Sequence, residues 1–311
     1  MKPFRTYQHL EGYPMTDRDK MEIGSKFWNE GKWNNFVAPF LLSLTSPEAR
    51  RELVLVDMGC NSGLFLKLAQ DWGFGRVVGV DSDREAVRRG VEWRDKNDGN
   101  YEIRRQNMEN CIEDLPLADY TVLANAHYYF TINDWLDYLD KLQYKTRYCI
   151  IVTAEKRSKQ ACWASADISD IRKYFKSWEE VGFINVISDD GSPGYRKLWG
   201  ICFKSPYIER VPIDDLDRGN HVQDNFYGEI DKGLPFQETK YYKIMKPYRN
   251  NLSDDRLNNW FKDRIALFED VRKNGLKRPV YINSNKRILD GNHKSSILEY
   301  LGFKTVIVRE T

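Results

Sequence analysis

The stretch L-V-L-V-D-M-G-C-N-S-G-L-F, residues 53–65, decides the fold. A short apolar run ends in Asp57, a turn containing Gly59 and Gly63 follows, and an apolar repeat of helical period begins at Leu64. Glycine lets the backbone turn tightly and come close to a ligand, and a helix start presents free N–H groups. The stretch therefore predicts a buried strand, a ligand-binding turn and a helix.

The same alternation of strand and helix continues along the chain. Further strands are expected at 76–81, 101–106, 120–124, 147–153, 184–188 and 197–204. Helices are expected at 27–44, 64–72, 83–97 and 131–142, with another that begins near 168 and stops at Gly182. Such alternation indicates a parallel sheet covered on both faces. The last two strands have no long helix between them, which predicts a hairpin and an antiparallel edge.

The sequence changes in character after residue 204. Ser-Pro at 205–206 and Val-Pro at 211–212 indicate a linker, and a polar region rich in Gly and Asn follows. Beyond it we expect an amphipathic helix at 253–273, strands at 279–282, 287–290 and 305–308, and a helix at 293–301. We therefore predict an α/β domain over residues 1–204 and a smaller α+β domain over residues 205–311.

Composition restricts the classes of partner and compartment. The chain of 311 residues has a net charge of +2, and no block of Lys and Arg stands out. This balance disfavours DNA as a partner and leaves a structured RNA open. Five scattered cysteines without a C-x-x-C pair argue against a disulfide framework and a zinc site. The first residues lack a signal peptide and no apolar stretch reaches membrane length, so we expect a cytoplasmic protein without a membrane partner.

Asp81 ends the second strand, R-V-V-G-V-D, beside the glycine turn. In a sheet of this kind, a carboxylate at that place can accept both ribose hydroxyls of a nucleoside. A dinucleotide-binding turn needs the pattern G-x-G-x-x-G. When Gly59 is taken as the first glycine of that pattern, the second and third glycine positions are occupied by Asn61 and Leu64. The large side chain of Leu64 weakens the alternative of an NAD-dependent oxidoreductase.

The segments V-D-M-G-C-N-S-G-L-F and V-G-V-D-S-D resemble the first two motifs of class I S-adenosylmethionine-dependent methyltransferases. The resemblance covers residues 26–204 and implies a Rossmann-like, doubly wound fold with S-adenosylmethionine as cofactor. Asn61 stands where many members carry glycine, and Asn is the residue after Gly that best tolerates a left-handed backbone. The family pattern implies that Gly59, Cys60, Asn61 and Gly63 line the methionine part, while Asp57 orients the turn or meets the amino group. The cofactor-binding residues implied in full are Asp57, Gly59, Cys60, Asn61, Gly63, Asp81, Ser82, Asn107, Met108 and Asn125, with Asn107 and Met108 at the adenine.

The fourth strand runs into A-N-A-H-Y-Y-F, residues 124–130. Parallel sheets bind ligands at the C-terminal ends of their strands, so this loop should face the methyl group. His127 titrates near neutrality and is the candidate catalytic base, with Tyr128 beside it at the acceptor. The alternatives are a hydrogen-bonded structural histidine and a core tyrosine. The segment of residues 26–36 faintly resembles the corresponding segment of transfer-RNA wobble-uridine carboxymethyltransferases. An RNA acceptor therefore stays open beside a small-molecule acceptor.

The C-terminal region resembles the ParB/sulfiredoxin-like fold over residues 205–311. The segments that carry the resemblance are V-P-I-D-D-L (211–216), N-G-L-K-R-P-V-Y-I (274–282), I-L-D-G-N-H-K-S-S-I-L-E-Y-L-G (288–302) and K-T-V-I-V-R-E (304–310). A glycine turn before a helix start favours phosphate, and the family binds ATP, ADP or CTP there. The implied phosphate-binding residues are Asp290, Gly291, Asn292, His293 and Lys294. Lys294 stands where arginine is usual, and Asn292 stands where sulfiredoxins carry cysteine.

The sequence as a whole predicts an enzyme that transfers a methyl group from S-adenosylmethionine to an unidentified acceptor. Its C-terminal domain would bind a nucleotide or phosphate, or assist in holding the acceptor. Two alternatives concern that domain alone. It could be a small-molecule kinase that uses Glu229 or Glu238 as its carboxylate, or a nucleotide-gated module that binds DNA or a protein partner.

Overall fold

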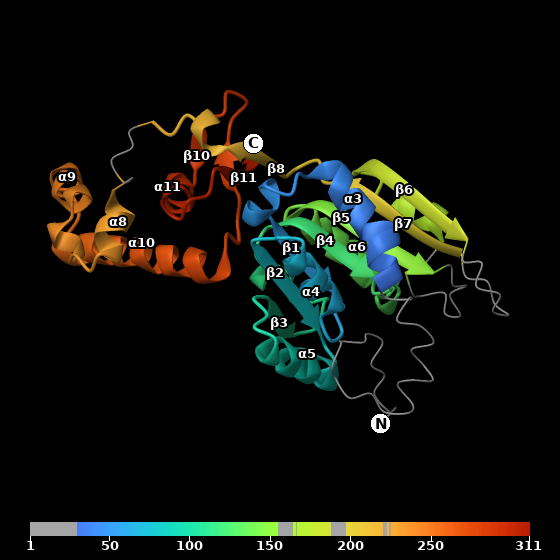
Figure 1. Ribbon diagram of the computed structural model, residues 1–311. Coiled ribbons are helices and arrows are strands. Elements are labelled where there is room, and N and C mark those ends of the chain that lie inside the picture. Colours follow the sequence, from blue (N-terminus) through green and yellow to red (C-terminus); the bar gives the residue numbers. More distant parts are fainter. Residues whose placement is uncertain (1–29, 155–163, 166, 188–196, 220–222, 224) are drawn as a thin grey trace. The chain divides into compact units, whose positions relative to one another are not determined.

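The computed structural model describes residues 30–154, 164–165, 167–187, 197–219, 223 and 225–311. The chain divides into two compact units, Met1–Pro206 and Tyr207–Thr311. Figure 1 shows the first unit in blue to yellow and the second in yellow to red. Each unit has a sheet of its own, so each is described separately.

A seven-stranded sheet in the order β3-β2-β1-β4-β5-β7-β6 forms the centre of the first unit. Strands β1 to β5 run parallel, which confirms the predicted mostly parallel α/β sheet. Its strands are β1 (Val54–Met58), β2 (Arg76–Asp81), β3 (Glu102–Arg105), β4 (Ala118–Ala124), β5 (Thr146–Ala154), β6 (Glu179–Ile187) and β7 (Lys197–Lys204). The order reverses at β1 and β4, the place where open α/β sheets bind ligands.

The antiparallel strand is β7, and it lies one place inside the edge, between β5 and β6. The hairpin is therefore as predicted, but β6 is the edge strand. Trp199, Ile201 and Phe203 of β7 are buried, whereas Val181 and Phe183 of β6 are partly exposed, so the more apolar strand takes the inner place.

The prediction that Gly182 stops a helix is wrong, because the helix ends earlier and Gly182 belongs to β6. The strand has a register irregularity between Glu180 and Gly182. A Cβ atom added at Gly182 would lie 2.8 Å from Cε1 of Phe40. The glycine therefore makes room for the ring of Phe40 rather than ending a helix.

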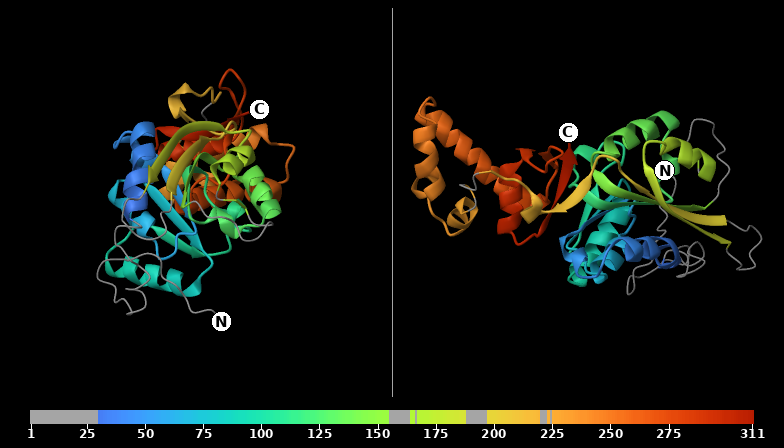
Figure 2. Two further views of the ribbon diagram at one scale, coloured as in Figure 1. Left: turned by 90° about the vertical axis from the view of Figure 1, so that its right-hand side faces the viewer. Right: turned by 90° about the horizontal axis from the view of Figure 1, so that it is seen from above.

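Helices cover both faces of this sheet (Figure 2). They are η1 (Trp33–Val37), α3 (Ala38–Leu44), α4 (Leu64–Asp71), α5 (Arg84–Lys96), α6 (Ile132–Leu142) and α7 (Ile168–Tyr174). One core contains Trp33, Phe65 and Trp93, from η1, α4 and α5. The other contains Trp135 and Phe175, from α6 and the residue after α7. Burial of these rings on two faces provides much of the hydrophobic stabilisation of the unit.

Two helix starts are capped as their residue types predict. The carboxylate of Asp83 accepts hydrogen bonds from the N–H groups of Glu85 and Ala86 at the start of α5. The hydroxyl of Thr131 accepts a hydrogen bond from the N–H group of Asp134 at the start of α6. Side-chain caps of this kind satisfy N–H groups that the helix itself leaves free, and they fix where each helix begins.

The second unit has a four-stranded mixed sheet in the order β10-β9-β11-β8. Its strands and α-helices are β8 (Glu209–Pro212), α8 (Phe226–Asp231), α9 (Lys240–Tyr248), α10 (Asp254–Asn274), β9 (Val280–Ile282), β10 (Ile288–Asp290), α11 (Asn292–Tyr300) and β11 (Thr305–Glu310). The predicted helix over 253–273 and the three predicted strands are confirmed. Helices α8 and α9 were not predicted. They lie in the polar segment, rich in Gly and Asn, that follows the linker, where the sequence analysis expected no helix.

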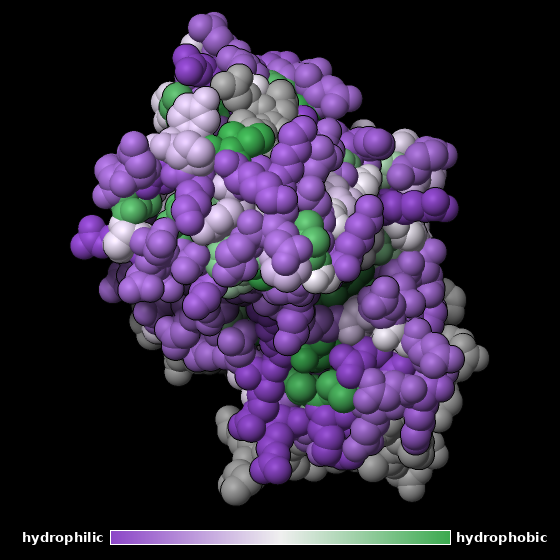
Figure 3. All heavy atoms as spheres, turned by 90° about the vertical axis from the view of Figure 1, so that its left-hand side faces the viewer, coloured by the Kyte–Doolittle hydropathy of each residue, from purple (hydrophilic) through white to green (hydrophobic). Residues whose placement is uncertain are grey.

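Hydrophilic residues predominate on the face drawn in Figure 3, and apolar residues appear there in small, separate patches. This surface agrees with a charged fraction of 30%. Within the part of the chain that the structure describes, no helix is both long and apolar enough to cross a membrane. Cys60, Cys111, Cys149 and Cys202 are buried free thiols.

Candidate cofactor site

The turn after β1 is held to β2 by its backbone. The N–H groups of Gly59 and Cys60 donate to the carbonyl oxygen of Val80 over 2.8 and 3.0 Å. The backbone is left-handed at Gly59, Asn61 and Gly63, with φ of 79°, 51° and 89°. A Cβ atom at Gly59 would lie only 2.9 Å from that of Ala126, so this position requires glycine. Asn61 adopts the left-handed backbone that its residue type tolerates.

Asp81, at the end of β2, ties this turn to the start of α5 through its side chain. Oδ2 accepts the N–H group of Asn61 and Oδ1 accepts that of Asp83, both over 2.8 Å. Burial raises the pKa of this carboxyl, and the backbone hydrogen bonds oppose the rise. A carboxylate oxygen has two lone pairs, so each oxygen of Asp81 can accept a further hydrogen bond from a ligand hydroxyl.

Asp57, at the end of β1, is a buried carboxyl, only 1% exposed. Its Oδ2 atom has no hydrogen-bond partner among the described residues. Burial, together with the charge of nearby Asp81, raises the pKa of Asp57 to about 8. An unpartnered buried acceptor is costly for the fold, and a cationic amino group is the partner that would both satisfy it and favour its charged form.

Cys60 contributes its backbone to the turn, because its side chain points into the core. It is fully buried, and a Cβ atom placed on Gly79 of β2 would lie 2.7 Å from its Sγ atom. Burial raises the pKa of the Cys60 thiol. Ser82, by contrast, is exposed. Gly63 has a left-handed backbone immediately before α4 and provides no side-chain cap to that helix.

Asn107 and Met108 follow β3 in a tight turn. The amide oxygen of Asn107, an exposed residue, accepts the N–H group of Glu109 over 3.1 Å, and its Nδ2 atom donates to the Glu109 carboxylate over 3.2 Å. Met108 lies against the glycine turn, since its Sδ atom would be 3.5 Å from a Cβ atom on Gly59. The structure therefore brings Met108 to the turn and engages the Asn107 amide locally.

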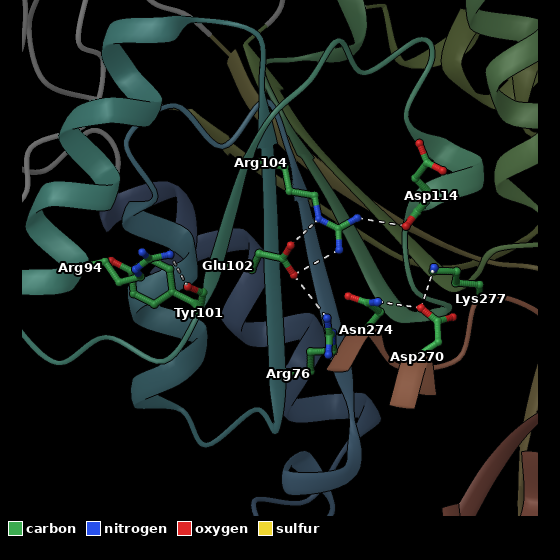
Figure 4. A network of polar contacts seen from close by, with 9 residues as sticks. All are labelled: Arg76, Arg94, Tyr101, Glu102, Arg104, Asp114, Asp270, Asn274 and Lys277. Atoms are coloured by element: carbon green, nitrogen blue, oxygen red, sulfur yellow. Dashed lines mark hydrogen bonds and ion pairs between the residues drawn. The ribbon is translucent and has the colours of Figure 1, made fainter. Parts of the chain in front are cut away.

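A charged network on β2 and β3 supports this region, and the sequence analysis did not identify it (Figure 4). Arg104 Nε donates to Glu102 Oε1 over 2.6 Å, and its Nη1 atom donates to the carbonyl oxygen of Asp114 over 3.0 Å. Arg76 donates to the same carboxylate over 3.3 Å. Arg104 thereby ties β3 to the end of the segment that carries Asn107 and Met108. The sequence did contain a sign of this network. Glu102 and Arg104 are spaced i, i+2 on a strand, so their side chains lie on the same face of the sheet.

The loop after β4 lies beside the glycine turn through Ala126. Asn125 is left-handed, with φ of 56°, and its N–H group donates to the carbonyl oxygen of Val152 over 2.8 Å. His127 is fully buried, with its ring 5.9 Å from that of Trp135. Burial lowers the pKa of His127 to about 4, so the ring is neutral at physiological pH. The side chain of Tyr128 lies outside the part of the structure that is described.

In the second unit, the residues predicted for phosphate surround the start of α11. Gly291 precedes the helix with φ of 106°, and no side chain caps it. The Nζ atom of Lys294 donates to the carbonyl oxygen of Pro279 over 3.1 Å. Asp290 is exposed, and Oδ1 of Asn292 is buried without a partner among the described residues. The ring of His293 lies between two tyrosine hydroxyls, so its nitrogen atoms and the Lys294 ammonium are engaged within the unit.

Three solved structures are similar to the chain. PH0226 from Pyrococcus horikoshii OT3 is 12% identical, with a TM-score of 0.48, over 65% of this chain and 96% of that protein. The magnesium protoporphyrin IX methyltransferase ChlM from Synechocystis PCC 6803, solved with bound S-adenosylmethionine, is 14% identical, with a TM-score of 0.47, over 62% and 87%. The N-methyltransferase NodS from Bradyrhizobium japonicum WM9, in complex with S-adenosylhomocysteine, is 14% identical, with a TM-score of 0.48, over 61% and 93%. No curated protein matches the sequence.

The fold and the left-handed turn between Asp57 and Asp81 define an open α/β domain whose sheet order reverses beside that turn. The model of the methyltransferase domain family matches residues 31–188, which is half of the chain. The chain belongs to this family, and it is a methyltransferase.

Proposed function

We propose that the first unit transfers the methyl group of S-adenosylmethionine to a small molecule that approaches along the loop after β4. One observation carries the proposal: two carboxyl groups, Asp57 and Asp81, flank a left-handed glycine turn at the point where the sheet order reverses. A small molecule is preferred over RNA because a net charge of +2 on 311 residues provides little attraction for phosphates.

The residues present fit this cofactor. Asp81 would accept the ribose hydroxyls with the lone pairs that its backbone bonds leave. The orphaned Oδ2 atom of Asp57 would accept the cationic amino group. Met108 would pack against the adenine, while Gly59 allows the close approach of the methionine part. When bound, S-adenosylmethionine supplies an electrophilic methyl group, and the chain contributes chiefly by positioning.

The loop after β4 would form the acceptor side of the site. Asn125 and Tyr128 belong to the loop after β4, and His127 is the candidate base that the sequence indicates. Its complete burial against Trp135 supports a different role, in which the neutral ring packs this loop and fixes its path. A variant with phenylalanine at position 127 distinguishes these roles, because it keeps the packing and removes the base.

We propose further that the second unit is a ParB/sulfiredoxin-like module that binds ATP, ADP or CTP through its phosphates. The support is the glycine turn at Gly291 and the uncapped start of α11, where free N–H groups favour an anion. The module would then either assist methyl transfer or act as a sensor that binds a nucleotide.

A thermal-shift series tests both parts on the full chain. The ligands are S-adenosylhomocysteine, NAD, ATP, ADP and CTP, each with and without magnesium. A ligand at about 100 times its dissociation constant stabilises the folded state by about 2.7 kcal/mol, which is readily measured. We expect a shift with S-adenosylhomocysteine and with one nucleotide. A shift with NAD and none with S-adenosylhomocysteine would refute the proposal for the first unit.

The acceptor class is then decided with methyl-labelled S-adenosylmethionine. The full chain is incubated separately with total RNA and with a small-molecule extract, and the label is followed in each. Label in the small-molecule fraction alone supports the proposal, whereas label in RNA contradicts the choice of acceptor.

A further inference from the structure

Helices α9 and α10 of the second unit bring two arginine side chains onto one indole ring. The Cζ atoms of Arg264 and Arg249 lie 3.8 and 4.9 Å from the ring centroid of Trp260. The Nη1 atom of Arg264 also donates to the carbonyl oxygen of Trp260 over 3.1 Å. Figure 1 shows α9 beside the N-terminal end of α10; Arg249 follows α9 directly, and Trp260 and Arg264 belong to α10. Cation–π stacking fixes both guanidinium groups in place.

Neither of these two guanidinium groups has a carboxylate within ion-pair distance among the described residues. Other cations on or after α10 do have one. Arg272 pairs with Asp231 over 2.5 Å. Lys277 pairs with Asp270 over 3.0 Å, as Figure 4 shows. Arg264 is also half-buried, with its Nε atom shielded and unpartnered. Two unbalanced cations that are held together cost free energy, and an anion bound between or beside them would offset that cost.

Polar donors adjoin the arginines. Tyr227 Oη lies 2.6 Å from Nδ1 of His293, and Tyr241 Oη lies 3.2 Å from Nε2. The rings of Tyr241 and His293 lie 5.9 and 5.8 Å from that of Trp260. Burial, followed by the charge of Arg264, lowers the pKa of His293 to about 4, so the ring stays neutral and adds no charge. Hydroxyl groups and an indole face thus border the two cations.

The charge pattern of α9 extends this positive region. Lys240, Lys243 and Lys246 recur every third residue, and the helix from Lys240 to Tyr248 contains no acidic residue. Lys246 pairs with Asp254 over 3.7 Å. Lys240 and Lys243 are exposed. Exposed lysines on the helix that leads into Arg249 raise the local concentration of anions and speed their capture.

We propose that Arg249 and Arg264, stacked on Trp260, bind the phosphate group of a phosphorylated small molecule. A phosphomonoester carries a charge of about −1.5 to −2 at neutral pH, which matches two guanidinium groups. Planar guanidinium groups also bind phosphate through paired hydrogen bonds. This site is separate from the cofactor site of the first unit and does not rest on methyl transfer. It adjoins the proposed site at the start of α11 through His293, but it would depend on the two arginines and not on Lys294.

The test is calorimetric titration of the full chain with inorganic pyrophosphate and with ADP at constant ionic strength. The variants are Arg249→Gln, Arg264→Gln and Lys294→Gln. Lys262→Gln is the matched control, because it removes one positive charge from an exposed position of the same helix. Citrate is the carboxylate probe. Thermal unfolding and S-adenosylhomocysteine binding check that each variant folds, and Arg264→Lys replaces Arg264→Gln if the latter does not.

We expect the wild type to bind pyrophosphate or ADP, and each arginine-to-glutamine change to weaken binding at least about tenfold. Arg264→Lys keeps the charge but loses the planar group, so it should weaken binding less. Lys262→Gln should bind as the wild type does, and Lys294→Gln should leave in place the binding that the arginine changes remove. The proposal is overturned by a wild type that binds neither probe, by unchanged binding in both arginine variants, by citrate binding as tightly as pyrophosphate, or by loss of binding in Lys294→Gln alone.

Discussion

Asp81 accepts a 2.8 Å hydrogen bond from the backbone N–H group of Asn61, so the side chain at the end of β2 holds the turn that follows β1. The same carboxylate accepts the N–H group of Asp83 before α5. One residue thus shapes the turn and presents the lone pairs proposed for the ribose. Its removal should affect cofactor binding more strongly than stability.

Asp81→Ala removes both proposed ribose contacts and should lower the affinity for S-adenosylhomocysteine by at least about tenfold, since hydrogen bonds to a charged group each contribute about 1.5–3 kcal/mol. Asp81→Asn keeps one acceptor oxygen and should lie between this variant and the wild type. Calorimetry at a temperature where all three are folded provides the comparison. Unchanged affinity in Asp81→Ala would show that the ribose site is misassigned.

Asp57→Asn should change how stability depends on pH. Burial raises the pKa of Asp57 from 3.8 to about 8, so between these values the folded chain keeps a proton that the unfolded chain releases. The wild type therefore loses stability as pH rises through this window, and the variant should lack this component. Urea unfolding of both proteins at several pH values from about 4 to about 8 measures the difference. Parallel curves for the two proteins would count against a raised pKa.

Gly79→Ala tests the packing beneath the turn. Its Cβ atom would lie 2.5 Å from Cδ1 of Leu66 and 2.7 Å from Sγ of Cys60. Overpacking of this kind costs about 1–3 kcal/mol, measured as the free energy of unfolding. The double variant Gly79→Ala with Cys60→Ala removes the clash with Sγ but keeps the Cβ atom of residue 60 at 2.9 Å, so it should recover part of the loss. Strictly additive losses would mean that the two side chains do not meet.

His127→Ala should destabilise the first unit by about 2–4 kcal/mol, because it leaves a cavity beside Trp135. His127→Phe should retain most of the stability. Because burial lowers the pKa of His127 from 6.5 to about 4, the folded chain binds fewer protons than the unfolded chain between these values. That difference makes stability rise with pH there, and His127→Phe should lack this contribution. Once an acceptor is known, full activity in His127→Phe would exclude a catalytic base at this position.

Local chemistry predicted much of the first unit. Asp83 and Thr131 are residue types that cap helices, and both do so. Asn61 tolerates a left-handed backbone and adopts one. These features depend on a residue and its immediate neighbours, so a single sequence contains the information needed to predict them.

Features that depend on distant segments could not be predicted in this way. The side chain of Cys60 points toward Gly79 on the next strand. The ring of Phe40 leaves no room for a side chain at position 182, which is why glycine occurs there. The ring of His293 lies between tyrosines of α8 and α9, helices that the sequence analysis missed. In each instance the residue type suggested one role. The role that the structure shows depends on a contact with a segment that is distant in the sequence, and residue type alone cannot predict such a contact.

The most direct test of the central claim is calorimetric titration of the full chain with S-adenosylhomocysteine and, separately, with NAD. The site between Asp57 and Asp81 predicts one-to-one binding of S-adenosylhomocysteine and no heat with NAD. Binding of NAD without binding of S-adenosylhomocysteine would contradict it.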